Sequence, residues 1–140
     1  MNDLTLRDRG FEFTILSTVG YGRQAICYEA RDQNQNKFFL KKLKNRTAEN
    51  EYAFKKAYEV NQKLLKFPGN SFSTPFGYFE DLKHGPFVVM PKFAGKTVGK
   101  THFKDLHELF NCILRLAKAI NASHEAGFLV IDLSPENVYV

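Results

Sequence analysis

Hydrophobic residues recur with two different periods along this 140-residue chain, and few folds share the order in which the two periods occur. Near the N-terminus apolar residues alternate with polar ones, which is the period of half-buried strands. Three such runs are separated by a pair of glycines and by a polar turn: residues 11–19, 25–31 and 37–44. Because short turns join antiparallel neighbours, we expect a three-stranded antiparallel meander here.

A helix and two further strands are predicted after the meander. Thr47 can cap the helix, and Pro68-Gly69 is expected to end it. The two strands are predicted near residues 76–80 and 86–92. The predicted sheet therefore has five strands and one accompanying helix.

A second, longer helix is predicted toward the C-terminus. Apolar residues recur at three- and four-residue steps from Asp105 onward, and Gly127 is expected to stop this helix. Residues 95–100, which contain glycines and lysines, form the best boundary between the sheet-rich part and the helical part. The predicted fold class is therefore α+β.

The composition indicates a folded core but no single class of function. Hydrophobic residues make up 44% of the chain, and no stretch approaches the roughly 20 apolar residues that span a membrane, so we expect a cytoplasmic protein. Cys27 and Cys112 lack the paired spacing of a metal site, which suggests reduced packing residues. The net charge of +5 is concentrated in residues 37–104, but dispersed lysines are usually a solvated face. Nucleic-acid binding is therefore a distant alternative.

Four stretches of the sequence, taken together, indicate a functional site. The first is the glycine pair Gly20-Tyr21-Gly22, which joins two predicted strands and not a strand to a helix. The second is a strand lysine, Lys41, with Lys42 as an obvious competitor. The third and fourth are the apolar run of residues 87–95 and the segment of residues 123–137.

These stretches resemble the protein kinase-like superfamily, in its serine/threonine branch. Residues 20–30 resemble the pattern Gly-x-Gly-x-x-Gly-x-Val-Tyr-x-Ala, and residues 38–41 resemble Val-Ala-Ile-Lys. Residues 87–95 resemble the fifth strand, the gatekeeper and the hinge. Residues 123–137 resemble Leu-His-x-x-Gly-x-x-His-Arg-Asp-Leu-Lys-Pro-Glu-Asn, which is the most specific of the four matches. The resemblance covers residues 11–140, although a hairpin turn or a buried strand would also explain the shorter matches.

The resemblance implies a nucleotide site for ATP. Lys41 would hold the α- and β-phosphates, and a helix carboxylate would orient it; Glu59 is the first candidate, while Glu49 and Glu51 remain open. The glycine loop would cover the phosphates with its backbone amides. The other implied contacts to the nucleotide come from the loop, the following strand and the hinge: Gly20, Tyr21, Gly22, Cys27, the gatekeeper Met90, Pro91 and Phe93.

The resemblance also implies catalytic and metal-binding residues. Asp132 would accept the proton of a protein serine or threonine hydroxyl, and Asn137 would coordinate Mg²⁺. Several positions depart from the family pattern. Val130-Ile131 replaces His-Arg, and Ser134 replaces a lysine. Phe39 stands where a small alanine normally faces the adenine, so its ring could fill the space that the base needs.

The family places an Asp-Phe-Gly motif after Asn137, whereas this sequence stops at Val140. We therefore expect an N-lobe and hinge at residues 1–93, the start of a C-lobe at 94–140, and no turnover by this chain alone. We expect the apolar stripe of the long helix to be covered by a protein partner or by a second copy of the chain. Two alternatives remain: a pseudokinase-like scaffold, and a small-molecule kinase of related fold.

Overall fold

The structure is a computed structural model that describes residues 4–66, 73–130 and 133–140. The described residues form two compact units. The first comprises residues 4–61 and 73–92, and the second comprises residues 62–66, 93–130 and 133–140.

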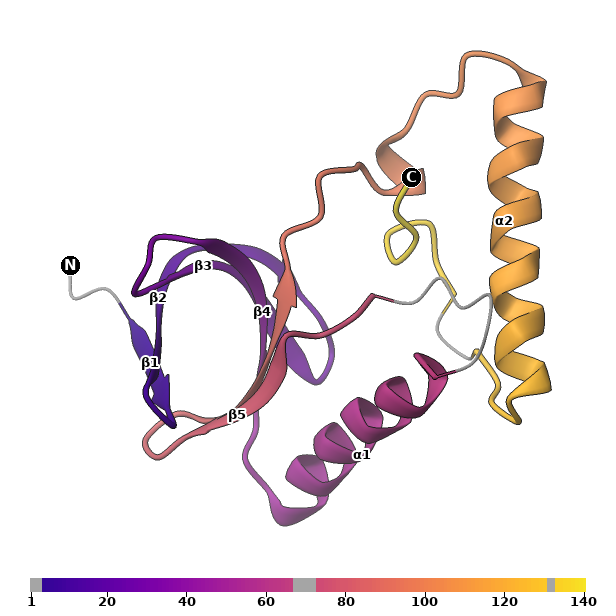
Figure 1. The fold of residues 1–140 in the computed structure, drawn as a ribbon. Helices are drawn as coiled ribbons and strands as arrows, with labels where there is room; N and C mark the ends of the chain where they lie inside the picture. The colour runs from indigo at the N-terminus through magenta and orange to yellow at the C-terminus, as the bar shows by residue number, and fades with distance from the viewer. Residues whose placement is uncertain (1–3, 67–72, 131–132) are drawn as a thin grey trace. The chain divides into compact units, whose positions relative to one another are not determined.

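The first unit is built on a six-stranded antiparallel sheet with the strand order β1-β2-β3-β4-β6-β5 (Figure 1). The strands are β1 (Thr5–Asp8), β2 (Phe11–Tyr21), β3 (Ala25–Asp32), β4 (Lys37–Leu43), β5 (Gly77–Asp81) and β6 (Gly85–Pro91). The five predicted strands are confirmed to within about two residues at each end. The sixth, β1, was not predicted, because Leu6 is its one apolar residue and a single residue establishes no period.

Strand β1 is joined to β2 by a tight turn at Arg9-Gly10. Both residues have positive φ, 49° and 82°, as a two-residue hairpin of the favoured type requires. The register pairs Leu6 with Phe13. Both side chains are fully buried, so β1 contributes to the core as well as to the sheet.

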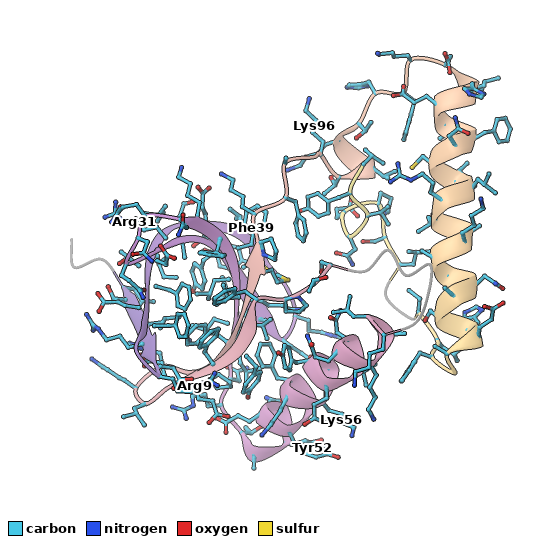
Figure 2. The ribbon with its side chains drawn as sticks, in the orientation of Figure 1. Arg9, Arg31, Phe39, Tyr52, Lys56 and Lys96 are labelled. Atoms are coloured by element: carbon cyan, nitrogen blue, oxygen red, sulfur yellow. The ribbon has the colours of Figure 1, made fainter. Side chains whose placement is uncertain are left out.

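The core of the first unit lies inside the curve that the strands follow in Figure 1. Phe13 is at its centre: its ring lies 5.4 Å from that of Phe79 and 6.0 Å from those of Phe38 and Phe87, at steep angles typical of edge-to-face packing. Aliphatic side chains fill the remaining space: Leu6, Ala30, Leu40 and Val89. Figure 2 shows the same dense packing of rings within the sheet.

Helix α1 (Ala48–Leu64) begins at the predicted cap. The backbone N–H of Asn50 donates to the hydroxyl oxygen of Thr47 over 3.1 Å, which satisfies one of the free donors at a helix start. The rings of Phe54 and Tyr58 pack on Tyr78 of β5, at 6.1 and 5.6 Å. The predicted stop at Pro68-Gly69 lies outside the described residues.

The second unit contains the 3₁₀ turn η1 (Val98–Lys100) and helix α2 (Leu106–Glu125). Asp105 caps α2 by accepting the N–H of Glu108 at 2.8 Å, and Gly127, with φ of 83°, follows its end. Both predicted boundaries are therefore confirmed. Within the described part of the chain, no helix is both long enough and apolar enough to cross a bilayer.

Candidate functional site

Three candidate site residues of the first unit, Cys27, Lys41 and Met90, lie on one face of its sheet together with Phe39. Strand register pairs Cys27 with Lys41, and Phe39 with Met90. Paired residues share a face, and side chains alternate along a strand. Leu40, between Phe39 and Lys41, belongs to the buried core, so these four side chains lie on the opposite, outer face.

The glycine-containing segment is a turn between two strands, as predicted. Gly20 pairs with Cys27 at the end of the β2–β3 ladder. The Gly22 N–H donates to the carbonyl oxygen of Ala25 over 2.8 Å, and a Cβ on Gly22 would lie 3.1 Å from that oxygen. The turn is therefore tight enough to favour glycine. It lies directly beside Cys27, the residue that pairs with Lys41.

Lys41 and Lys42 have different surroundings. Lys41 is exposed on the outer face. Burial raises the pKa of the Cys27 thiol, and the positive charge of Lys41, on the paired strand position, partly offsets this rise. Lys42 is half-buried and its Nζ lies 3.4 Å from the Leu43 carbonyl oxygen; burial, and then Arg46, lower its pKa. Of the two lysines, Lys41 is the one beside the glycine turn.

In the second unit, the chain near Asn137 pairs with the connection that follows Phe93. The N–H of Val98 donates to the carbonyl of Val138 at 2.8 Å, and Thr97 and Tyr139 form an isolated β-bridge. The rings of Phe93 and Tyr139 lie 4.8 Å apart. The structure thus brings the last predicted hinge residue into the same cluster as the chain next to the predicted metal ligand.

Asn137 itself lies in a turn, with its N–H donating to the Ser134 carbonyl over 3.0 Å. Asp132, the predicted proton acceptor, lies outside the described residues. Sequence patterns gave no sign of the Phe93–Tyr139 contact, because it joins residues 46 positions apart by aromatic packing alone.

Comparison with known structures identifies the fold. The chain superimposes on vaccinia related kinase 3 with a TM-score of 0.69 and 22% identity, over 99% of this chain and 46% of that one. A Plasmodium kinase domain gives a TM-score of 0.74 and 16% identity, over 91% of this chain and 39% of that one. The chain has a protein kinase-like fold. The predicted fold class is confirmed, with β1 as an additional strand.

A search of curated proteins agrees with the kinase-like fold. A probable serine/threonine-protein kinase of Clostridium acetobutylicum is 28% identical over 134 residues, which cover 91% of this chain and 20% of that protein. The chain therefore spans one fifth of this relative and less than half of the two solved chains. No family model matches the sequence.

Within the kinase-like fold, the predicted carboxylate partners of Lys41 contact other cations. Glu59 lies 3.6 Å from Nζ of Lys56 on the same helix, and Glu51 lies 2.9 Å from Nε of Arg46. Among the described residues, no ion pair joins Lys41 to Glu49, Glu51 or Glu59. The partner of Lys41 stays a prediction.

The C-terminal end of β6, which carries the predicted hinge, is tied to β3 by an ion cluster that sequence reasoning missed. The Glu29 carboxylate lies 3.1 Å from Nζ of Lys92 and 3.3 Å from Nζ of Lys37. Hydrogen bonds from Lys92 and then Lys37 lower the pKa of Glu29. The cluster links Lys92, the residue that follows Met90 and Pro91, to β3 and β4 at the surface.

The replacement of a small residue by Phe39 has a visible consequence in the kinase-like sheet. Phe39 is half-buried and stands opposite Met90, the predicted gatekeeper. Figure 2 shows its side chain beside β6. A large side chain therefore occupies the part of the outer face between Lys41 and the hinge.

Proposed function

We propose that the outer face of the kinase-like sheet binds the phosphates and adenine of Mg-ATP. The observation that carries the proposal is the position of Lys41, an exposed ammonium group directly across from Cys27 and beside the Gly20–Gly22 turn. Backbone N–H groups and a lysine charge are the groups that bind nucleotide phosphates in kinases. The adenine would lie toward Met90, with the backbone of Pro91 and Phe93 as its polar partners.

We propose further that the complete protein transfers the γ-phosphoryl group to a protein serine or threonine. The hydroxyl oxygen forms a bond to the γ-phosphorus while the bond between that phosphorus and the β–γ bridging oxygen breaks, and ADP leaves. Asp132 would accept the hydroxyl proton. Lys41 would hold the α- and β-phosphates throughout.

Mg²⁺ is the metal implied by this proposal. Asn137 offers an amide oxygen, and an oxygen ligand of this kind suits Mg²⁺. When bound, the ion would neutralise charge that develops on the transferring phosphoryl group. The turn that holds Asn137 is fixed by the Ser134 carbonyl, which supports a ligand in a set position.

A pseudokinase-like scaffold is the second candidate. It is favoured by Phe39, which stands opposite Met90 on the face that the adenine would need. Val130-Ile131 and Ser134, in place of His-Arg and lysine, also favour reduced catalysis. In this case the lobe would serve as a regulatory partner for another protein.

The partner and the location are also proposals. Helix α2 exposes a row of apolar side chains: Leu106 at 71%, Phe110 at 65%, Ile113 at 50% and Leu114 at 52%. Such a surface favours self-association or a protein partner in a cytoplasmic setting. Size-exclusion chromatography should show a dimer or larger species, and a monomer at high concentration would contradict this proposal.

A thermal-shift experiment with Mg-ATP tests nucleotide binding. Millimolar Mg-ATP should raise the melting temperature of the wild-type chain, because a ligand that binds only the folded state stabilises it. Lys41→Ala should abolish the shift. Lys44→Ala is the matched control: it removes an equal charge from an exposed lysine just beyond β4 and should keep the shift. Equal shifts in both variants, or none in the wild type, would support the scaffold alternative.

A further inference from the structure

Strands β1 and β5 are the two edges of the sheet, yet they lie against each other. In the strand order β1-β2-β3-β4-β6-β5 they have no common ladder. The sheet curves so far that β1 approaches β5, as Figure 1 shows. The line along which they meet, residues 7–9 against residues 78–81, is called the seam here.

Two carboxylates bridge the seam in opposite directions. The Arg7 N–H of β1 donates to Oδ2 of Asp81 over 2.8 Å. The Glu80 N–H of β5 donates to Oδ2 of Asp8 over 2.9 Å. Each edge strand thus provides a carboxylate that accepts a backbone N–H of the other, and charge-assisted bonds of this kind are stronger than neutral ones.

Asp81 also organises the hairpin between β5 and β6. Its second oxygen, Oδ1, accepts the N–H of Lys83 at 2.9 Å and the N–H of His84 at 2.8 Å, and it lies 2.9 Å from Nδ1 of the same histidine. The Asp81 residue is only 8% exposed. One buried carboxylate therefore connects β1 to the turn at the far end of β5.

The Arg9 side chain adds a third connection across the seam. Its guanidinium donates to the Tyr78 carbonyl and lies over the Phe79 ring, with 5.0 Å between Cζ and the ring centroid. The same side chain is held by Asp8, at 3.0 Å. Asp8 therefore has two roles, as an acceptor from β5 and as a partner that positions Arg9.

We propose that Asp8 and Asp81 form a clasp, which here means the two carboxylates whose hydrogen bonds across the seam hold β1 against β5. This clasp closes the sheet. Uncovered edge strands present unpaired N–H and C=O groups and invite pairing with other chains. The clasp satisfies backbone N–H groups on both edge strands with carboxylate side chains. It does so without a backbone ladder between β1 and β5. It also keeps Leu6, which is fully buried, over the phenylalanine core. The proposal is independent of nucleotide binding.

Hydrogen exchange of individual amides tests the clasp. Asp8→Ala should speed hydrogen exchange of the Glu80 amide and of the β1 amides, including Leu6, by at least about tenfold. The reason is that the acceptor is lost and β1 separates locally from β5. The β3–β4 ladder should keep wild-type rates. Asp8→Asn should restore most of the protection, since its amide oxygen can still accept. The Asp8 side chain is 19% exposed, so Asp8→Ala is expected to disturb folding less than the same change at the more buried Asp81 would.

Asp32→Ala is the matched control. Asp32 also accepts backbone N–H groups, those of Asn34 and Asn36 at 2.8 Å, but within the single turn between β3 and β4. Its loss should affect that turn and leave β1 protected. The clasp proposal is overturned if Asp8→Ala leaves Glu80 and β1 at wild-type rates. It is equally overturned if exchange rises uniformly over the sheet, or if Asp32→Ala releases β1 as well.

Discussion

At the scale of the residue, adjacent positions on one strand have different surroundings. Lys41 and Lys42 are the same residue type at adjacent positions. In the sequence, only the spacing from the glycine pair favoured Lys41. The structure adds the physical reason: Lys41 shares a face with Cys27, whereas Lys42 is half-buried with Nζ near a backbone carbonyl. Spacing favoured Lys41, which stays a prediction, but it gave no sign of the surroundings of Lys42.

Contacts between distant side chains could not be predicted from local pattern. Glu29 meets Lys92 across 63 positions, and Arg7 meets Asp81 across 74. No period or motif encodes such pairs, because they depend on strand register and on how far the sheet curves. Motifs in the sequence therefore gave candidate site residues, but they gave no sign of these long-range contacts.

The first prediction concerns Phe39 and the space for adenine. Phe39→Ala should tighten ATP binding by about tenfold, because overpacking of this size costs about 1–3 kcal/mol and 1.4 kcal/mol equals a factor of ten. Isothermal titration calorimetry of the wild type and the variant measures the change. Tyr52→Ala, which removes a 70% exposed ring from α1, should leave the affinity unchanged. Unchanged or weaker binding by Phe39→Ala would show that the ring does not obstruct the base.

The second prediction concerns Asp81 and acid stability. Burial tends to raise the pKa of Asp81, but hydrogen bonds from the Arg7 N–H and from His84 outweigh it, so the pKa lies below its ordinary value. A lowered folded-state pKa stabilises the protein above the unfolded value, about pH 4, and this stabilisation is lost as the pH falls through the folded value. Urea unfolding at pH 7 and pH 3 should show a smaller loss of stability in Asp81→Asn than in the wild type. Parallel losses would contradict the assigned role.

At the scale of the element, periodicity and capping residues predicted most of the fold. Thr47 and Asp105 cap the two helices, and Gly127 follows the second. These signals are local, so a single sequence contains them. Strand β1 has no such signal: its four residues, Thr5–Asp8, are stabilised by pairing with β2 and by the clasp, both of which exist only in the folded sheet.

The third prediction concerns the core that the strands enclose. Phe13→Ala should lower the free energy of unfolding by about 3–5 kcal/mol, the usual cost of removing a buried ring that leaves a cavity. Phe13 is fully buried against four other phenylalanine rings, those of Phe11, Phe38, Phe79 and Phe87. Leu82→Ala is the control, because Leu82 is 99% exposed and its loss should cost almost nothing. Urea titration followed by far-UV circular dichroism compares them, and similar losses in both variants would contradict the assigned core.

At the scale of the whole molecule, the segment of residues 123–137 and the order of the elements resemble the same fold, that of the protein kinases. The comparisons confirm the fold, and the activity is proposed from Lys41, Asp132 and Asn137. These three residues belong to segments that no local pattern connects, since 91 positions separate the first from the second. The proposed activity therefore requires that one bound Mg-ATP contact Lys41 directly and Asn137 through Mg²⁺, with the acceptor hydroxyl beside Asp132.

The final prediction is tested by NMR titration of the amide-labelled chain with Mg-ATP. A common nucleotide site predicts one saturable transition in which amides of residues 20–27, 39–41, 90–93 and 137–139 shift together, and in which Lys41→Ala removes all of these shifts. Shifts confined to the lysine-rich surface outside these segments, or separate transitions for Lys41 and for Asn137, would contradict it.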